Sequence, residues 1–108
     1  MNVLSIDTAG PVIGVGLIAG QHRLSCTERV QRGADAKILP WALDLVRQAG
    51  IRLSDLDGLS VAIGPGSFTG LRVGMAAAMG LSQSLNIPIW GSSSLVHRAE
   101  VKQYPLTL

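Results

Sequence analysis

The sequence predicts an α/β domain with a mixed five-stranded sheet whose faces carry helices. Three short apolar segments separated by turn residues open the chain, within residues 2–30. Two segments with helical periodicity follow, residues 37–49 and 69–85, and each leads into a further apolar strand. The resulting order, βββαβαβα, is that of the ribonuclease-H-like lobe of the actin-like ATPase superfamily. This analogy between patterns of elements supports a prediction of the fold but not of the function.

The first three strands, residues 2–7, 12–19 and 22–30, are expected to form an antiparallel meander. Gly and Pro between the first two supply turn chemistry, and Gly20 with Gln21 makes a tight turn into the third. The third segment alternates polar and apolar side chains, which is typical of a strand with one buried face.

The first helix is expected over residues 37–49. Asp35 has the side chain of an N-cap residue. Pro40 is tolerated only in the first turn of a helix, which places the helix start near Lys37 or a kink at Pro40. Gly50 is expected to end the helix as its C′ residue.

The remaining elements follow from shorter signals. Asn86 is expected to close the second helix, and Tyr104 with Pro105 to break the last one. In chain order these elements are a helical turn at 53–57, a strand at 58–63, the helix at 69–85, a strand at 87–90 and a helix at 92–103. Residues 1–108 are expected to form one domain, a single lobe.

Composition and charge restrict the function classes. Hydrophobic residues make up 47% and charged residues 15% of the chain, as in a globular domain. The net charge of +2, without a run of Lys or Arg, gives no electrostatic basis for nucleic-acid binding. Cys26 is the single cysteine, so an internal disulfide is excluded. Because the chain lacks a signal-peptide pattern and any apolar run of about 18 residues, we expect a cytoplasmic protein without a membrane span.

A glycine-rich loop, GPGSFTGLRVG at residues 64–74, joins the fourth strand to the second helix. It lacks the lysine of a P-loop, and it has one residue too many between its glycines for the dinucleotide motif G-x-G-x-x-G. Two interpretations stay open. Backbone N–H groups at the helix start, with Gly66, Ser67 and Thr69, bind an anion. Alternatively, a hydroxyl caps the helix while the glycines adopt unusual backbone angles.

Asp7 and Thr8 are a second candidate for chemistry, at the carboxyl end of the first strand. By analogy with actin-like lobes, an acid at this place faces a nucleotide and its metal. A lone carboxylate is equally suited to bonding the loop backbone, so both interpretations stay open. No other carboxylates pair at a spacing that indicates acid–base chemistry.

Both helices carry two apolar faces, although a helix on the surface of a domain needs only one. One face of each helix is expected to pack on the sheet, and the other on a partner or elsewhere in this chain. On the first helix the faces are Ile38, Trp41, Ala42, Leu45 and Ala49, and Leu39, Leu43 and Val46. On the second they are Leu71, Met75, Ala78, Met79 and Ser82, and Val73, Ala76, Ala77, Gly80 and Leu81.

Several of these segments resemble the TsaB (YeaZ) family. They are SIDTA near the start, the helix AKILPWALDLVRQAG and above all GPGSFTGLRVGMAAAMGLSQSLNIPIWGSSSL, and the match runs along essentially the whole chain. This family belongs to the bacterial machinery that makes threonylcarbamoyladenosine on tRNA. The resemblance implies the first of two actin-like lobes, with the second lobe absent.

The resemblance also implies partners, and a role without chemistry of its own. TsaB binds the paralogous catalytic subunit TsaD through the two helices of its first lobe, and the complex recruits the ATPase TsaE. The same surface forms homodimers when TsaB is alone. The resemblance implies no cofactor for this chain, ATP being bound only in the complex, and only indirect contact with tRNA.

His97 marks a departure from the catalytic paralogue. TsaD carries a His-x-x-x-His metal pair after the strand that corresponds to residues 87–90, where this chain has Ser93 and His97. One ligand is therefore missing, and we expect no metal site. No nucleophile–base pair is present in the sequence, so we expect no catalytic residue.

We therefore expect a scaffold or activator lobe that helps to transfer a threonylcarbamoyl group to the tRNA adenosine next to the anticodon, by holding TsaD in a competent state. The expected interface residues are Leu39, Trp41, Leu43, Val46, Val73, Ala77 and Gly80. The rival is a nucleotide-binding actin-like ATPase or kinase lobe. Its phosphate site would use Asp7, Thr8, Gly66, Ser67 and Thr69, within residues 7–8 and 64–70. A third interpretation is a folded fragment without activity of its own.

Overall fold

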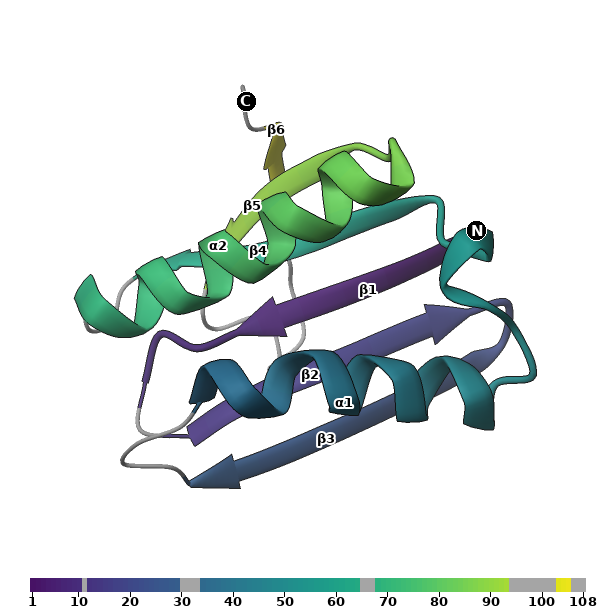
Figure 1. Ribbon diagram of the computed structural model, residues 1–108, viewed down its shortest axis with the longest axis horizontal. Coiled ribbons are helices and arrows are strands. Elements are labelled where there is room, and N and C mark those ends of the chain that lie inside the picture. The colour runs from purple at the N-terminus through teal and green to yellow at the C-terminus, as the bar shows by residue number, and fades with distance from the viewer. Residues whose placement is uncertain (11, 30–33, 65–67, 94–102, 106–108) are drawn as a thin grey trace.

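The computed structural model describes residues 1–10, 12–29, 34–64, 68–93 and 103–105 (Figure 1). Its strands are β1 (Asn2–Asp7), β2 (Val12–Ala19), β3 (His22–Arg29), β4 (Gly58–Gly64), β5 (Ile89–Ser93) and β6 (Gln103–Pro105). Its helices are α1 (Ala34–Gln48), the short 3₁₀ helix η1 (Leu53–Asp55) and α2 (Phe68–Leu85). The five predicted strands and the first two predicted helices are therefore present.

The strands form one mixed sheet in the order β3-β2-β1-β4-β5-β6. β1, β2 and β3 pair antiparallel as the predicted meander, whereas β4 pairs parallel to both β1 and β5. Parallel neighbours need a crossover connection, which α1 provides before β4 and α2 provides between β4 and β5. This confirms the ribonuclease-H-like fold class, to which β6 adds a short sixth strand at one edge.

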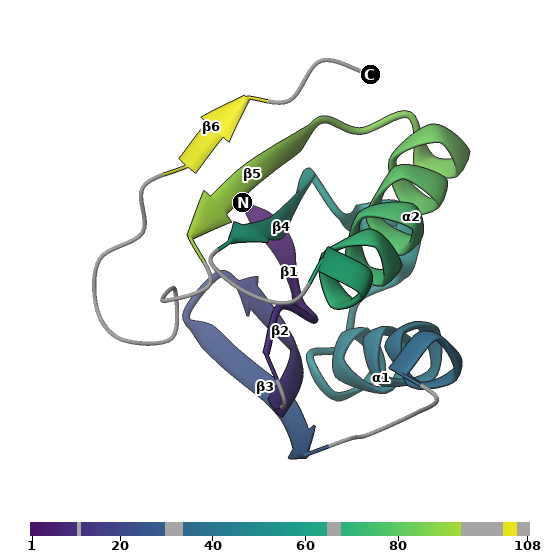
Figure 2. The ribbon, with the colours of Figure 1, turned by 90° about the vertical axis from the view of Figure 1, so that its left-hand side faces the viewer.

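Both helices cover the same face of the sheet (Figures 1 and 2). α1 packs on β2 and β3, α2 packs mainly on β4, and the two helices contact each other. No helix within the described residues packs on the opposite face of the sheet. The two helices therefore form a single layer with an outer surface of its own.

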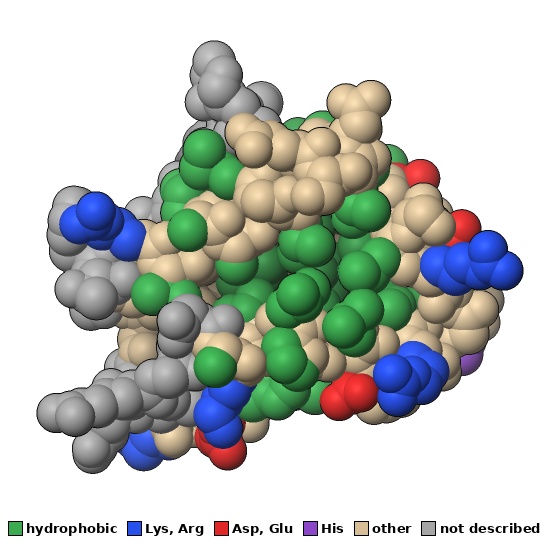
Figure 3. Space-filling view, viewed as in Figure 1, with side chains coloured by type: hydrophobic (Ala, Val, Ile, Leu, Met, Phe, Trp, Pro, Cys, Tyr) green, Lys and Arg blue, Asp and Glu red, His purple; other side chains and the backbone are tan. Residues whose placement is uncertain are grey.

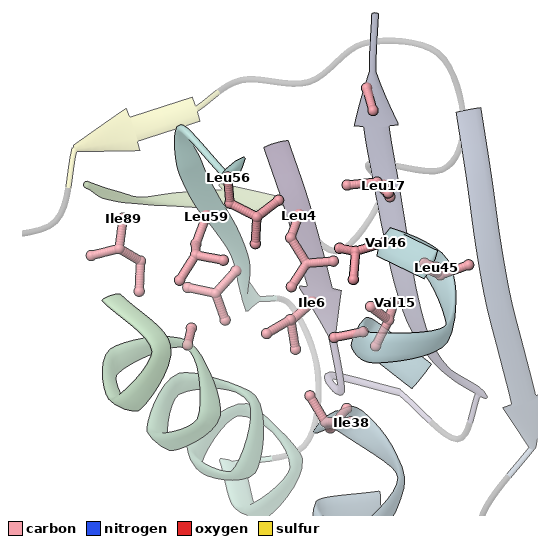
Figure 4. Packing of buried hydrophobic residues seen from close by; sticks show 14 residues of the cluster. Leu4, Ile6, Val15, Leu17, Ile38, Leu45, Val46, Leu56, Leu59 and Ile89 are labelled. Atoms are coloured by element: carbon pink, nitrogen blue, oxygen red, sulfur yellow. The ribbon is translucent and has the colours of Figure 1, made fainter. Parts of the chain in front are cut away.

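The hydrophobic core lies between the sheet and this helical layer (Figure 4). Alternate residues of each strand point into it, as the period of two in a strand requires. Cross-strand pairing places the central side chains in two rows, Leu17–Leu4–Leu59 and Val15–Ile6–Val61. From above, α1 contributes Ile38, Ala42, Leu45 and Val46, and α2 contributes Ala78.

α1 begins at Ala34, about one turn before the predicted start near Lys37. Asp35 is therefore inside the helix and is not its N-cap, and Pro40 lies beyond the first turn. Pro40 has no N–H to bond the carbonyl of Ala36. Both residues are exposed, so water can bond this carbonyl and the helix continues through the proline.

The predicted ends of both helices are confirmed. Gly50 has a left-handed φ of 75°, and the N–H of Ile51 reaches back to the carbonyl of Val46 at 3.0 Å. Asn86 has a φ of 54°, and the N–H of Ile87 bonds the carbonyl of Ser82 at 3.1 Å. Each residue ends its helix by turning the chain out of the right-handed region.

The predicted strand at 87–90 and helix at 92–103 need correction at their ends. β5 runs from Ile89 to Ser93, because its pairing with β4 continues through the serines. Pairing with a neighbour outweighs the weak local preference of serine. Gln103 lies in β6, an edge strand that tolerates Pro105 at its end. The rest of the predicted helix, residues 94–102, lies outside the described residues.

Gly58 is expected to be essential to the packing of β4 against β5. A Cβ atom at Gly58 would lie 2.2 Å from Cζ3 of Trp90, whose ring covers the glycine. We expect Gly58→Ala to lower the free energy of unfolding by about 1–3 kcal/mol, because the indole must move. Urea denaturation measures this loss. The matched control is Gly10→Ala, whose Cβ would have nothing within 4 Å. An equal loss in both variants would contradict the packing argument.

Candidate functional site

The side chains of Asp7 and Thr8 point to different sides of the sheet at the end of β1. Ile6 points into the core below the helices, so the next side chain on β1, that of Asp7, points to the opposite face of the sheet. Its Oδ1 atom accepts a hydrogen bond from the N–H of Ala9 at 3.0 Å. This closes a local turn, which is the role in the loop that the sequence left open for this carboxylate.

The hydroxyl of Thr8 is engaged with α2. Thr8 is 3% exposed, and its Oγ1 accepts a hydrogen bond from the N–H of Gly74 at 3.0 Å. The same hydroxyl donates to the carbonyl oxygen of Gly70. Of the other residues in the predicted phosphate site, Gly66 and Ser67 lie outside the described residues, and Thr69 belongs to the first turn of α2.

α2 approaches β1 closely because its inner face is made of small residues. Gly74, Ala78 and Ser82, four residues apart, are all buried. A Cβ atom at Gly74 would lie 2.5 Å from Oγ1 of Thr8 and 3.4 Å from Cγ2 of Ile6. The side chain missing at Gly74 is therefore what allows the contact with Thr8. Sequence reasoning missed this contact, although two glycines one helical turn apart, Gly70 and Gly74, were a signal for it.

The outer side of α1 carries exposed apolar side chains. Leu39 is 47% exposed and Leu43 is 40% exposed, one helical turn apart. Val46, which the sequence placed with them at the interface, is 4% exposed and belongs to the core. Val46 lies on the side of its apolar face that is nearest the sheet, so the sheet covers it.

Trp41 lies on the other flank of α1. Nζ of Lys37 is 6.0 Å from the centre of its ring, and Lys37 forms an ion pair with Glu28 on β3. This flank therefore faces β3. Leu39 is two residues, or about 200°, away around the helix, so it lies on the flank that faces α2. Trp41 therefore lies on a different flank from Leu39 and Leu43, as the two predicted apolar faces of this helix have it, and the expected interface set draws on both flanks.

Leu39 and Leu43 lie on the flank of α1 that faces α2. The two helices run in the same direction across the sheet (Figure 1), so opposite flanks meet. On α1 the residues of this flank come one position after a buried residue, and on α2 they come one position before a buried residue. It therefore holds Leu39 and Leu43 on α1 and Val73 and Ala77 on α2.

These four residues are called the inter-helix face below. Hydrophobic side chains gather in the hollow between α1 and α2 (Figure 3). Val73 and Ala77 are half-buried, whereas Gly80, the last expected interface residue, is exposed with nothing within 4 Å of a Cβ. The inter-helix face is thus apolar, concave and accessible.

Other kinds of site receive no support from the described residues. Among the side chains that the structure describes, no three His, Cys, Asp or Glu residues are close enough to hold a metal ion. His97 and the side chain of Ser93 lie outside that part. None of the described helices is long and apolar enough to cross a bilayer.

The chain matches proteins of threonylcarbamoyladenosine synthesis. The family model described as "TsaD: tRNA N6-adenosine threonylcarbamoyltransferase" matches residues 27–107. The "tRNA threonylcarbamoyladenosine biosynthesis protein TsaB" of Escherichia coli is 35% identical over 105 residues, which cover 93% of this chain and 43% of that protein. The chain belongs to the TsaB (YeaZ) family. A family model named for TsaD and relatives named TsaB thus match the same chain.

Solved structures agree with membership of the TsaB family. YeaZ from Pseudomonas aeruginosa superimposes with a TM-score of 0.81 at 33% identity, covering 85% of this chain and 43% of that one. RuvC of Thermus thermophilus has a TM-score of 0.54 at 15% identity, covering 84% and 63%, and shows the fold alone. The chain spans less than half the length of the TsaB relatives it matches.

Proposed function

We propose that this chain is a non-catalytic docking lobe in the synthesis of threonylcarbamoyladenosine on tRNA. Its partner is the catalytic subunit TsaD, which transfers the threonylcarbamoyl group to the adenosine next to the anticodon. TsaE joins through the complex, tRNA is contacted indirectly, and the chain forms homodimers when TsaD is absent. This lobe alone binds no cofactor, and any ATP binding requires the complex.

The inter-helix face is the observation that carries this proposal. Leu39 and Leu43 are large aliphatic side chains left 47% and 40% exposed beside one another. Burying a fully exposed leucine side chain is worth about 1.5–3 kcal/mol, so a partner that covers the exposed part of these two gains roughly half of that for each. Asp44 and Arg47, both exposed on α1, supply a polar rim, as interfaces usually have.

A paralogous lobe fits such a face for a geometric reason. The match to a TsaD family model over residues 27–107 covers both α1 and α2, so TsaD has counterparts of these helices. Two lobes of one fold can pack their helical layers against each other in a nearly two-fold arrangement. Small residues such as Ala77 and Gly80 then let helices of the partner approach closely.

The test is isothermal titration calorimetry of the 108-residue chain with purified TsaD and, separately, with ATP and Mg²⁺. We expect the chain to bind TsaD and to release no heat with nucleotide. The rival nucleotide-binding lobe predicts the reverse. Binding of ATP that is lost in Asp7→Ala, together with no binding of TsaD, would overturn the docking function.

A further inference from the structure

Thr8 joins the end of β1 to the main chain of α2. Its hydroxyl accepts from the N–H of Gly74 at 3.0 Å and donates to the carbonyl of Gly70. These two groups are one helical turn apart, and in an uninterrupted α-helix they bond each other. One hydroxyl, with a donor and an acceptor, thus engages both members of a helical N–H and C=O pair. A methyl group in its place could engage neither.

Hydroxyl contacts lie at both ends of the buried stripe of α2, one to β1 and one to the segment that follows the helix. Near its start the contact is Thr8 with Gly74, and near its end the hydroxyl of Ser82 donates to the carbonyl of Ile87 at 2.6 Å. Both contacts lie on the face of α2 that turns toward the sheet. Because the contact at Thr8 joins α2 to the end of β1, it limits how the helix can rotate about its own axis.

That rotation decides how the inter-helix face is presented. Val73 and Ala77 each precede a buried residue of the stripe by one position, about 100° around the helix. A small rotation of α2 would bury them further or lift them away from Leu39 and Leu43. The contact at Thr8 therefore acts on residues that Thr8 does not touch.

We propose that Thr8 is a positioning residue for the docking surface, setting the rotation of α2 through its hydroxyl. This inference rests on the proposed docking function. It gives Thr8 a role different from the phosphate contact that its place at the end of β1 predicts. The partner whose binding depends on this rotation is a protein lobe that packs on α1 and α2.

The test compares Thr8→Val, which keeps the shape but loses the hydroxyl, with Thr8→Ser, which keeps the hydroxyl. We expect Thr8→Val to weaken binding of purified TsaD about tenfold, and Thr8→Ser to bind like the wild type. Leu56→Val, a core change on neither helix, is the control for general destabilisation. It should leave the affinity unchanged at a temperature where all the variants are folded.

A second measurement reports the contact itself. Thr8→Val should speed hydrogen exchange of the Gly74 amide relative to its neighbours, whereas Leu56→Val should not. If Thr8→Val does not fold, Gly74→Ala removes the same contact from the helix side and should also weaken TsaD binding. Wild-type affinity in these variants, while Leu43→Arg abolishes binding, would overturn the positioning role and leave the docking function intact. Wild-type affinity in Leu43→Arg as well would overturn the docking function.

Discussion

Replacing Gly74 with alanine is expected to lower the free energy of unfolding by about 2–4 kcal/mol. The new Cβ would lie 2.5 Å from Oγ1 of Thr8 and close to Ile6, in a buried part of the core. Either α2 moves away from β1, or Thr8 rotates and leaves the backbone groups of Gly70 and Gly74 without its hydroxyl. Both outcomes cost stability, since neither neighbour is the end of a flexible side chain.

Gly80→Ala is the matched control on the same helix. Gly80 is exposed and its added Cβ would have nothing within 4 Å, so only the backbone preference changes. Alanine is a better helix former than glycine by about 0.8–1 kcal/mol, so Gly80→Ala should stabilise the fold. Urea denaturation of both variants measures the two opposite shifts. A stabilising or neutral Gly74→Ala would show that α2 does not approach β1 as described.

Leu43→Arg is expected to weaken binding of TsaD by at least about a hundredfold, which corresponds to about 3 kcal/mol. Leu43 is 40% exposed, so an arginine fits in the free chain with its charge in water. Docking would bury that charge against the helices of the partner, which costs the free energy of taking it out of water. Binding is therefore lost while the fold is kept. Circular dichroism measures whether the variant is folded, and calorimetry measures its binding of TsaD.

Ser25→Arg provides the control with the same charge. Ser25 is exposed on β3, and its side chain lies on the face of the sheet opposite the helices, since Leu24 and Cys26 point to the core. We expect Ser25→Arg to bind TsaD like the wild type. Equal weakening by both arginines would indicate a general effect of charge rather than a docking surface on α1.

Much of the fold was predictable because local signals and long-range packing agree. The alternation in β3, the glycine at position 50 and the asparagine at position 86 each predicted what the structure shows. The start of α1 was missed because Pro40 was taken as a limit, whereas the exposure of Pro40 and Ala36 makes a proline there tolerable. Ser92 and Ser93 join β5 because β4 offers them pairing, which no local pattern records.

The candidate site was harder to predict, because it depends on which flank of each helix meets which neighbour. The two apolar stripes of α1 were visible, but only the sheet decides that Val46 is buried while Leu43 is exposed. Asp7 and Thr8 are adjacent in sequence, yet Asp7 ends β1 and bonds the loop, whereas the hydroxyl of Thr8 bonds the main chain of α2. The pairing of Thr8 with Gly74 joins residues 66 positions apart and needs the packed fold to be seen.

Sedimentation velocity of an equimolar mixture of this chain and purified TsaD tests the central claim most directly. The account predicts one faster-sedimenting complex with the wild-type chain and with Ser25→Arg, and two separate species with Leu43→Arg. Separate species with the wild-type chain, or a complex that forms equally well with Leu43→Arg, would contradict docking through the inter-helix face.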